Sequence, residues 1–188
     1  VTEADEIRTR YLETRPAPAI IVLDNLDELG RSQPERVRNE LRDAAEDKLR
    51  QWSESYNGIL RRYDRDRFLA VFEKKDLERM KQSRFPIVEQ MHQIESPNGI
   101  EATISIGFGE DGENLGEGLQ FADKATELAL SRGGDQVAVK NQLSFEFFGG
   151  RGLEVEKRTK VKSRVMANTL AELMRDSSQV LVMGHRYA

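Results

Sequence analysis

Residues 58–73 carry the sequence GILRRYDRDRFLAVFE, which has the pattern of two strands joined by a turn. Two runs rich in aliphatic and aromatic residues flank a short charged segment, Asp64-Arg65-Asp66. Such runs favour β-strands, and aspartate is common where the chain turns. The pattern predicts two antiparallel strands, at 58–63 and 67–73, joined by a hairpin with a charged tip.

A continuous apolar run before the hairpin predicts a first strand in the centre of the sheet. Residues 19–23 read AIIVL, and Asp24 and Asn25 close the run with side chains that favour turns. Pro34 then suits the first position of a helix, and apolar residues recur every three or four positions up to Tyr56. We expect one long helix there, packed on the sheet.

The rest of the domain alternates between helical and strand periods. Asp76 is placed to cap a short helix and Pro86 to start another. Residues 100–106 alternate like a strand with two different faces, and residues 115–129 return to a helical period. Two short strands, 136–140 and 143–148, complete a domain at 18–150. This order predicts an α+β sandwich in which helices pack against one central sheet.

Charged segments flank that domain on both sides. Residues 1–17 hold a connector helix that ends before Pro16, and residues 151–178 have the apolar face of a linker helix. A new apolar strand lies within 179–188. No apolar run approaches the roughly 18 residues of a membrane-spanning helix. Val1 is not an initiator methionine, so we expect the natural protein to extend further, with any membrane segment there.

Composition narrows the classes of function. Of the 188 residues 38% are hydrophobic and 33% charged, which is typical of a folded soluble module rather than a disordered chain. The net charge of -4 argues against binding DNA or RNA, because neutralising many phosphates requires clustered lysine and arginine. The chain has no cysteine, which excludes disulfides and thiolate-bound zinc. A small nucleotide remains compatible with these numbers.

Several motifs between Pro18 and Phe148 resemble, in order, those of a GGDEF domain, the diguanylate cyclase fold. Leu23-Asp24-Asn25-Leu26 is similar to the segment that follows the family's first strand, and Ser105-Ile106-Gly107 to its "SIG" strand. The charged hairpin tip stands where the family carries its signature. Gly133-Gly134-Asp135 spells most of that signature, but it follows a helix near the end of the domain, so its position rules it out.

The resemblance implies a degenerate domain. In the family, two glycines let the backbone approach nucleotide phosphates, and an acidic pair binds divalent metal and the attacking hydroxyl. Asp64 and Arg65 replace both glycines, and Arg67 stands at the position of the catalytic acid. We therefore expect no cyclase activity. The family's other metal ligand aligns with Val22, whereas a shifted match puts Asp24 there instead.

The same fold match brings the turn after the first strand and the hairpin tip together at one end of the sheet. We expect weak binding of a purine nucleotide there, with magnesium entering alongside it, because arginine pairs well with phosphate. The candidate contacts are Asp24, Asn25, Asp64, Arg65, Asp66 and Arg67.

The C-terminal residues narrow the resemblance to the GdpP-type cyclic-di-AMP phosphodiesterases. Residues 180–185 read VLVMGH and are similar to the first strand of a DHH phosphoesterase domain, whose opening histidine, here His185, helps bind manganese. The resemblance implies a membrane-anchored bacterial protein with two transmembrane helices, a PAS domain, this cytoplasmic GGDEF domain and the DHH domain. It also implies hydrolysis of cyclic-di-AMP to linear pApA by the DHH domain, regulation by the PAS and GGDEF parts, and weak ATP hydrolysis by the latter.

Three functions compete at this point. The domain is a regulatory nucleotide binder, an active diguanylate cyclase, or a structural spacer that joins neighbouring domains or pairs two copies. The charges of the tip are also typical of a solvated, self-neutralising turn. His185 alone is an incomplete metal site, and His92, on a charged helix, is expected to be a solvated surface residue.

Overall fold

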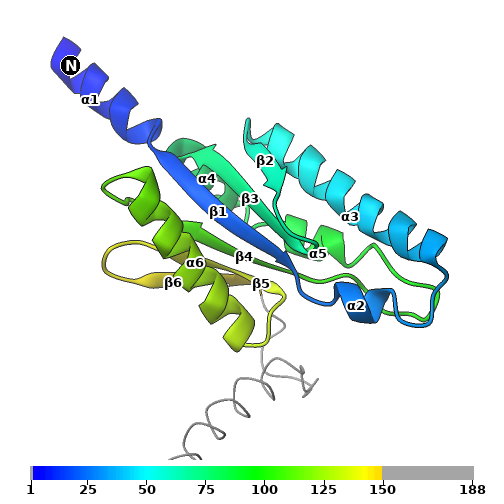
Figure 1. Cartoon of the computed structure of the whole chain (residues 1–188). Helices are drawn as coiled ribbons and strands as arrows, with labels where there is room; N and C mark the ends of the chain where they lie inside the picture. Colours follow the sequence, from blue (N-terminus) through cyan, green and yellow to red (C-terminus); the bar gives the residue numbers. More distant parts are fainter. Residues whose placement is uncertain (1, 150–188) are drawn as a thin grey trace, which may run out of the picture. The chain divides into compact units, whose positions relative to one another are not determined.

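The apolar run at 19–23 lies within β1 (Pro16–Leu23), an inner strand of a six-stranded sheet with the order β2-β3-β1-β4-β5-β6 (Figure 1). The structure, a computed structural model, describes residues 2–149. β4 and β5 pair in parallel, whereas every other neighbouring pair of strands is antiparallel. The predicted α+β class, a central sheet with helices packed on it, is confirmed.

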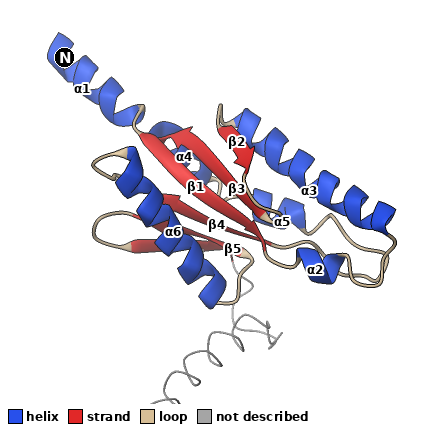
Figure 2. Ribbon diagram, in the orientation of Figure 1, coloured by secondary structure: helices blue, strands red, loops and turns tan. Residues whose placement is uncertain are grey.

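Helices cover both faces of this sheet (Figure 2). The other strands are β2 (Ile59–Arg62), β3 (Arg67–Glu73), β4 (Ile104–Gly109), β5 (Gln136–Lys140) and β6 (Phe145–Gly149). The helices are α1 (Glu3–Glu13), α2 (Leu26–Leu29), α3 (Glu35–Ser55), α4 (Lys74–Gln82), α5 (Ile87–Met91) and α6 (Leu115–Ser131).

The two faces of β1 belong to different cores, which explains why its apolar run is continuous. Ile21 and Leu23 lie in the larger core with side chains of α3, α4 and α5. Ile20 and Val22 point to the opposite face and pack against Ala122 of α6. Successive residues of a strand alternate between faces, so a strand covered on both sides must be apolar throughout.

The hairpin, the long helix and the helix before Gly133 are confirmed, although the long helix begins at Glu35 and Pro34 is its N-cap rather than its first residue. β2 and β3 pair in register from Ile59 with Val71 to Arg62 with Phe68, which leaves the charged residues at the tip. β1 begins earlier than predicted, at Pro16, and β6 begins later, at Phe145. The four-residue helix α2 was not predicted, because it is too short to show a helical period.

The prediction that Asp76 caps a helix is wrong. The helix after β3 begins at Lys74 with Glu73 at its N-cap, so Asp76 is not the cap. Asp76 is instead a buried residue of the first turn, and its Oδ1 accepts a hydrogen bond of 2.9 Å from Nη1 of Arg79. A carboxylate in the first turn of a helix is favoured by the helix dipole.

The strand expected from Ile100 begins only at Ile104, and all six residues of β4 are buried. Its second face, which carries Ser105, is not exposed to solvent because α6 packs over it. The residues just before β4 are held by a side chain: Asn25 donates from Nδ2 to the carbonyl oxygen of Glu101 and accepts from the N–H of Thr103. The side-chain amide of Asn25 thus makes hydrogen bonds to the backbone of residues 101 and 103, where the sequence pattern had predicted pairing with a neighbouring strand.

The predicted linker helix at 151–178 and the strand at 179–188, with His185, lie outside the described residues. Within residues 2–149, no helix has the length and apolar character needed to cross a membrane.

Candidate functional site

The end of β1 and the hairpin tip adjoin, as predicted. Val22 pairs with Arg67 across the ladder, and the N–H of Leu23 donates to the carbonyl oxygen of Asp66 at 2.9 Å. The turn that follows β1 continues into α2, which therefore starts beside the tip. This end of the sheet is where the polar residues singled out in the sequence meet.

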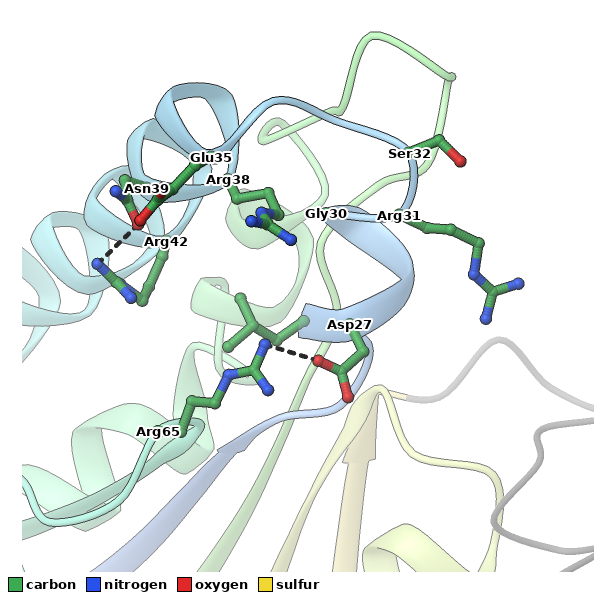
Figure 3. A pocket seen from close by; sticks show the side chains of 10 residues that line it. Asp27, Gly30, Arg31, Ser32, Glu35, Arg38, Asn39, Arg42 and Arg65 are labelled. Atoms are coloured by element: carbon green, nitrogen blue, oxygen red, sulfur yellow. Dashed lines mark hydrogen bonds and ion pairs between the residues drawn. The ribbon is translucent and has the colours of Figure 1, made fainter.

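A cavity of about 340 Å³ opens between α2, the start of α3 and the hairpin tip (Figure 3). The contributions of α3 are spaced at i, i+3, i+4 and i+7, so they lie on one face of the helix. The lining consists of Leu26, Asp27, Gly30, Arg31, Ser32, Glu35, Arg38, Asn39, Arg42 and Arg65. Only Leu26 among them has a large apolar side chain.

The lining is positively charged in a chain that is acidic overall. Four arginines face one aspartate and one glutamate, so the lining carries a net charge of +2, whereas the whole chain carries -4. In Figure 3, Arg38 and Arg65 reach into the same space from α3 and from the hairpin, while Arg31 extends away from it. A cavity of this kind attracts anions, because arginine presents a planar fork of donors that matches phosphate and carboxylate groups.

Local contacts hold these arginines in place. Arg65 pairs through Nη2 with Oδ1 of Asp27 at 2.8 Å, and Arg42 donates from Nη2 to Oδ1 of Asn39 at 3.2 Å. The stem of Arg38 lies against Gly30, where a Cβ would be only 2.9 Å from its Cγ. The glycine after α2 therefore allows α3 to approach closely enough to share the cavity.

A second, more open cavity of about 270 Å³ borders the tip and shares Arg42 and Arg65 with the first. Arg62, Tyr63 and Asp64 complete its lining. Arg62 is tied to α3, since its Nη1 donates to Oε2 of Glu46 at 3.0 Å. The two arginines common to both cavities are the centre of the candidate site.

The predicted contacts separate into two groups. Asp64 and Arg65 line a cavity, whereas Asp24, Asn25, Asp66 and Arg67 line neither of the two. Asn25 is engaged with the segment before β4 as described above. Arg38 and Arg42, which the sequence analysis did not single out, take the place of those residues in the cavity.

The carboxylate of Asp24 points into the domain. Its Oδ2 accepts hydrogen bonds from Oγ of Ser105 at 2.9 Å and from the N–H of Asp135 at 2.8 Å. Its Oδ1 is buried and has no hydrogen-bond partner among the described residues. Burial, reinforced by the charges of Asp135 and Asp66, raises the pKa of Asp24 to about 7.

These residues do not fit the metal site of a diguanylate cyclase. Val22 is buried against α6, Arg67 is a cation, and the oxygens of Asp24 face inward. Within residues 2–149, no group of three or more histidine, aspartate or glutamate side chains is arranged to hold a metal ion. The arginines at the tip offer donors suited to an anion rather than ligands for a metal ion.

His92 is not the solvated surface residue that was expected. Its side chain is only 8% exposed, and its Nε2 lies 2.6 Å from Oδ1 of Asp135. Its Nδ1 lies 3.4 Å from a carboxylate oxygen of Glu89. The turn at 133–135 packs over the end of α5, and the polar neighbours of His92 in the sequence concealed this contact.

Comparison with known proteins identifies the family of the chain. Residues 21–147 match a family model described as the GGDEF domain of cyclic-di-AMP phosphodiesterase GdpP-like proteins. The whole chain is 37% identical to the cyclic-di-AMP phosphodiesterase GdpP of Geobacillus thermodenitrificans, and 99% of it is 35% identical to PdeA of Listeria monocytogenes. The chain belongs to the GdpP-like GGDEF domain family. It spans 29% and 28% of the length of these two relatives.

Solved structures share the fold of this GdpP-like domain at low identity. The active GGEEF domain of a diguanylate cyclase from Vibrio cholerae aligns with 72% of this chain and 89% of its own, with a TM-score of 0.58 and 14% identity. The GGDEF domain of DgcB from Caulobacter crescentus, in complex with c-di-GMP, aligns with 73% and 83%, with a TM-score of 0.57 and 15% identity. At such identities the likeness concerns the fold alone.

Proposed function

We propose that this GdpP-like GGDEF domain regulates a cyclic-di-AMP phosphodiesterase by binding the phosphate groups of a purine nucleotide, ATP foremost. The observation that carries the proposal is the cavity beside the hairpin tip, into which Arg38, Arg42 and Arg65 bring three guanidinium groups from two elements. Bidentate pairs of arginine with phosphate are strong and directional. They take over the role that the glycine backbone has in an active cyclase.

The domain is not a diguanylate cyclase under this proposal. Cyclase chemistry needs a metal ion to neutralise phosphate charge and to activate the attacking hydroxyl. Arg67 stands at the position of the acid, and Val22 offers no ligand. We expect purified protein with GTP and magnesium to form no cyclic-di-GMP, measured by chromatography.

Binding should be weak. Asp27 and Glu35 line the same cavity as the arginines, and Asp64 lines the neighbouring one, so part of the positive charge is already compensated. We expect dissociation constants on the order of micromolar to millimolar. Magnesium, where present, enters with the nucleotide rather than on protein carboxylates, and any hydrolysis of ATP is slow.

The setting of the domain is also part of the proposal. We place it in the cytoplasmic portion of a membrane-anchored bacterial protein, between a PAS domain and a manganese-dependent DHH domain that hydrolyses cyclic-di-AMP to pApA. The names of the relatives support only the link to a cyclic-di-AMP phosphodiesterase, and the chain covers 29% and 28% of their length. Nucleotide bound here would then act on hydrolysis from a distance, and pairing of two copies is a second route for such control.

Isothermal titration with ATP, GTP and cyclic dinucleotides tests the proposal. Arg42→Ala and Arg65→Ala should each weaken ATP binding about five- to tenfold, because each removes a charged partner of the phosphates. Arg61→Ala is the matched control, since Arg61 is exposed on β2 of the same hairpin but lines neither cavity. It should stay within about twofold of the unmodified protein.

If the domain is only a structural spacer, the arginine variants should not affect nucleotide binding. Absence of any nucleotide binding, or binding that is indifferent to Arg42 and Arg65, would leave the domain with a purely structural role between its neighbours.

A further inference from the structure

The guanidinium of Arg65 already has an anionic partner. Nη2 of Arg65 lies 2.8 Å from Oδ1 of Asp27, and Figure 3 shows this pair among the side chains that line the cavity. The two residues come from different elements: Arg65 from the hairpin tip and Asp27 from α2. The contact therefore links the tip to α2 across the space where we place the phosphates of a ligand.

This ion pair is easily exchanged. The side chains of Arg65 and Asp27 are 68% and 79% exposed, so water and salt screen their attraction, and holding two long side chains in one geometry costs entropy. A phosphate group carries more charge than a carboxylate and offers more acceptor oxygens. Arg38 provides a second donor, because it makes no ion pair with any of the residues 2–149 and points into the same space.

We propose that Asp27 is an internal competitor for the anionic ligand: its carboxylate holds Arg65 until a phosphate group of a polyphosphate displaces it. The inference rests on the proposed function and adds to the same site a residue that sets the affinity for phosphate. It also assigns the recognised group, since Asp27 acts on the phosphate end of the ligand whether or not a nucleoside is attached. Free polyphosphates and nucleoside triphosphates should therefore respond alike to a change at Asp27.

Exchange of partners also changes what holds the hairpin tip. Without a ligand, α2 is tied to the tip by Asp27; with one, the tip is tied through phosphate to Arg38 and hence to α3. Binding thus moves the guanidinium of Arg65 from α2 to a phosphate shared with α3, to which Arg62 of the same hairpin is already tied through Glu46. This gives a ligand-dependent rearrangement without metal or covalent chemistry.

Removing the competitor should tighten binding. We would titrate tripolyphosphate and ATP, in separate experiments, into the 188-residue chain and into its Asp27→Asn variant. Asp27→Asn should tighten both ligands about two- to fivefold at low ionic strength, and the gain should shrink as salt is added. Glu28→Gln is the matched control, because it removes the same charge. Glu28 lies next to Asp27 on α2 and is exposed, but it does not line the cavity. Glu28→Gln should change affinity by less than about 1.5-fold.

The second arm asks whether Asp27 acts through Arg65. In the Arg65→Ala background, Asp27→Asn should give less than half of its gain in the unmodified protein, because the competition is gone. Equal gains for Asp27→Asn and Glu28→Gln, or a gain unaffected by Arg65→Ala, would overturn the inference in favour of a general charge effect. No gain with Asp27→Asn, while Arg42→Ala still weakens ATP binding, would also overturn it and leave the proposed function standing.

Absence of binding by both proteins would remove the proposed function and the inference together. Binding of tripolyphosphate only by Asp27→Asn would support the inference strongly. A gain confined to ATP would contradict it, since Asp27 would then be responding to the nucleoside.

Discussion

Two turns that contain aspartate meet the end of β1, and they have opposite characters. The hairpin tip, Asp64-Arg65-Asp66, is exposed at its first two residues, and Arg65 makes an ion pair with Asp27 that is mostly exposed to solvent. The turn Gly133-Gly134-Asp135 is half-buried at its end and holds the carboxylate of Asp24. The second turn carries the letters of the family signature, whereas the first has its position. Position in the fold, and not the letters, places the first turn at the cavity lined by arginines.

The buried turn serves packing. Gly134 has a φ of +75°, and a Cβ there would lie 2.8 Å from Oδ2 of Asp24. Asp135 binds Asp24 through its N–H and His92 through its side chain. These contacts join β1, α5 and the start of β5, so substitutions in this turn should alter stability. Substitutions at the exposed tip should alter binding instead.

The largest effect should come from the buried carboxylate. The pKa of Asp24 is about 7 in the folded state, against an ordinary value of 3.8. Between these values the folded protein keeps a proton that the unfolded chain releases, so stability falls as pH rises toward 7. Asp24→Asn keeps an acceptor for Ser105 and Asp135 but cannot ionise.

Relative to the unmodified protein, Asp24→Asn should therefore gain about 2–3 kcal/mol in free energy of unfolding between pH 5 and pH 8, since each pKa unit is worth about 1.4 kcal/mol. Urea unfolding at a series of pH values measures this difference. Curves that run parallel across that range would show that the carboxylate ionises freely in the folded state.

The next effect concerns Gly134. Gly134→Ala should cost about 2 kcal/mol, because alanine is strained at positive φ and its Cβ would press on the carboxylate of Asp24. The contribution of the contact with Asp24 can be measured separately by removing the Asp24 carboxylate. In an Asp24→Ala background the destabilisation by Gly134→Ala should fall to the backbone strain alone, about 1 kcal/mol. An equal cost in both backgrounds, by urea unfolding at pH 6, would deny the contact between the two residues.

The spacing of apolar residues predicted the fold, because the fold is determined largely by which side chains must be buried. The run at 19–23, the helical period after Pro34 and the strands around the tip are all parts of a core that any chain of this pattern must bury. The strand at Ile104 was predicted with a polar face because its sequence alternates. The covering by α6 that makes this face buried comes from an element later in the chain.

Of the residues that line the two cavities, the sequence predicted only those of the hairpin tip. Arg65 follows from the position of the hairpin tip, but Arg38 and Arg42 look like ordinary charged residues of a solvated helix face. They become site residues because α2 turns the chain back and sets α3 against the tip. His92 escaped for the same reason, since Asp135 lies 43 positions away in the sequence. Pairings over such separations leave no mark in a local pattern.

The smallest effect on stability should come from the tip itself, at Arg65, one of the two arginines proposed to matter most for binding. Arg65→Ala should change the free energy of unfolding by less than about 0.5 kcal/mol, because its ion pair with Asp27 is mostly exposed and surface pairs contribute little. Asp64→Ala, the matched control in the same tip, should behave likewise, although it removes an acceptor for the N–H of Arg65. Urea unfolding without ligand and titration with ATP, on the same preparations, separate the two properties. A loss of more than about 1 kcal/mol with Arg65→Ala would mean that the pair with Asp27 is structural, and its weaker ATP binding would then report partial unfolding of the tip rather than a lost phosphate contact.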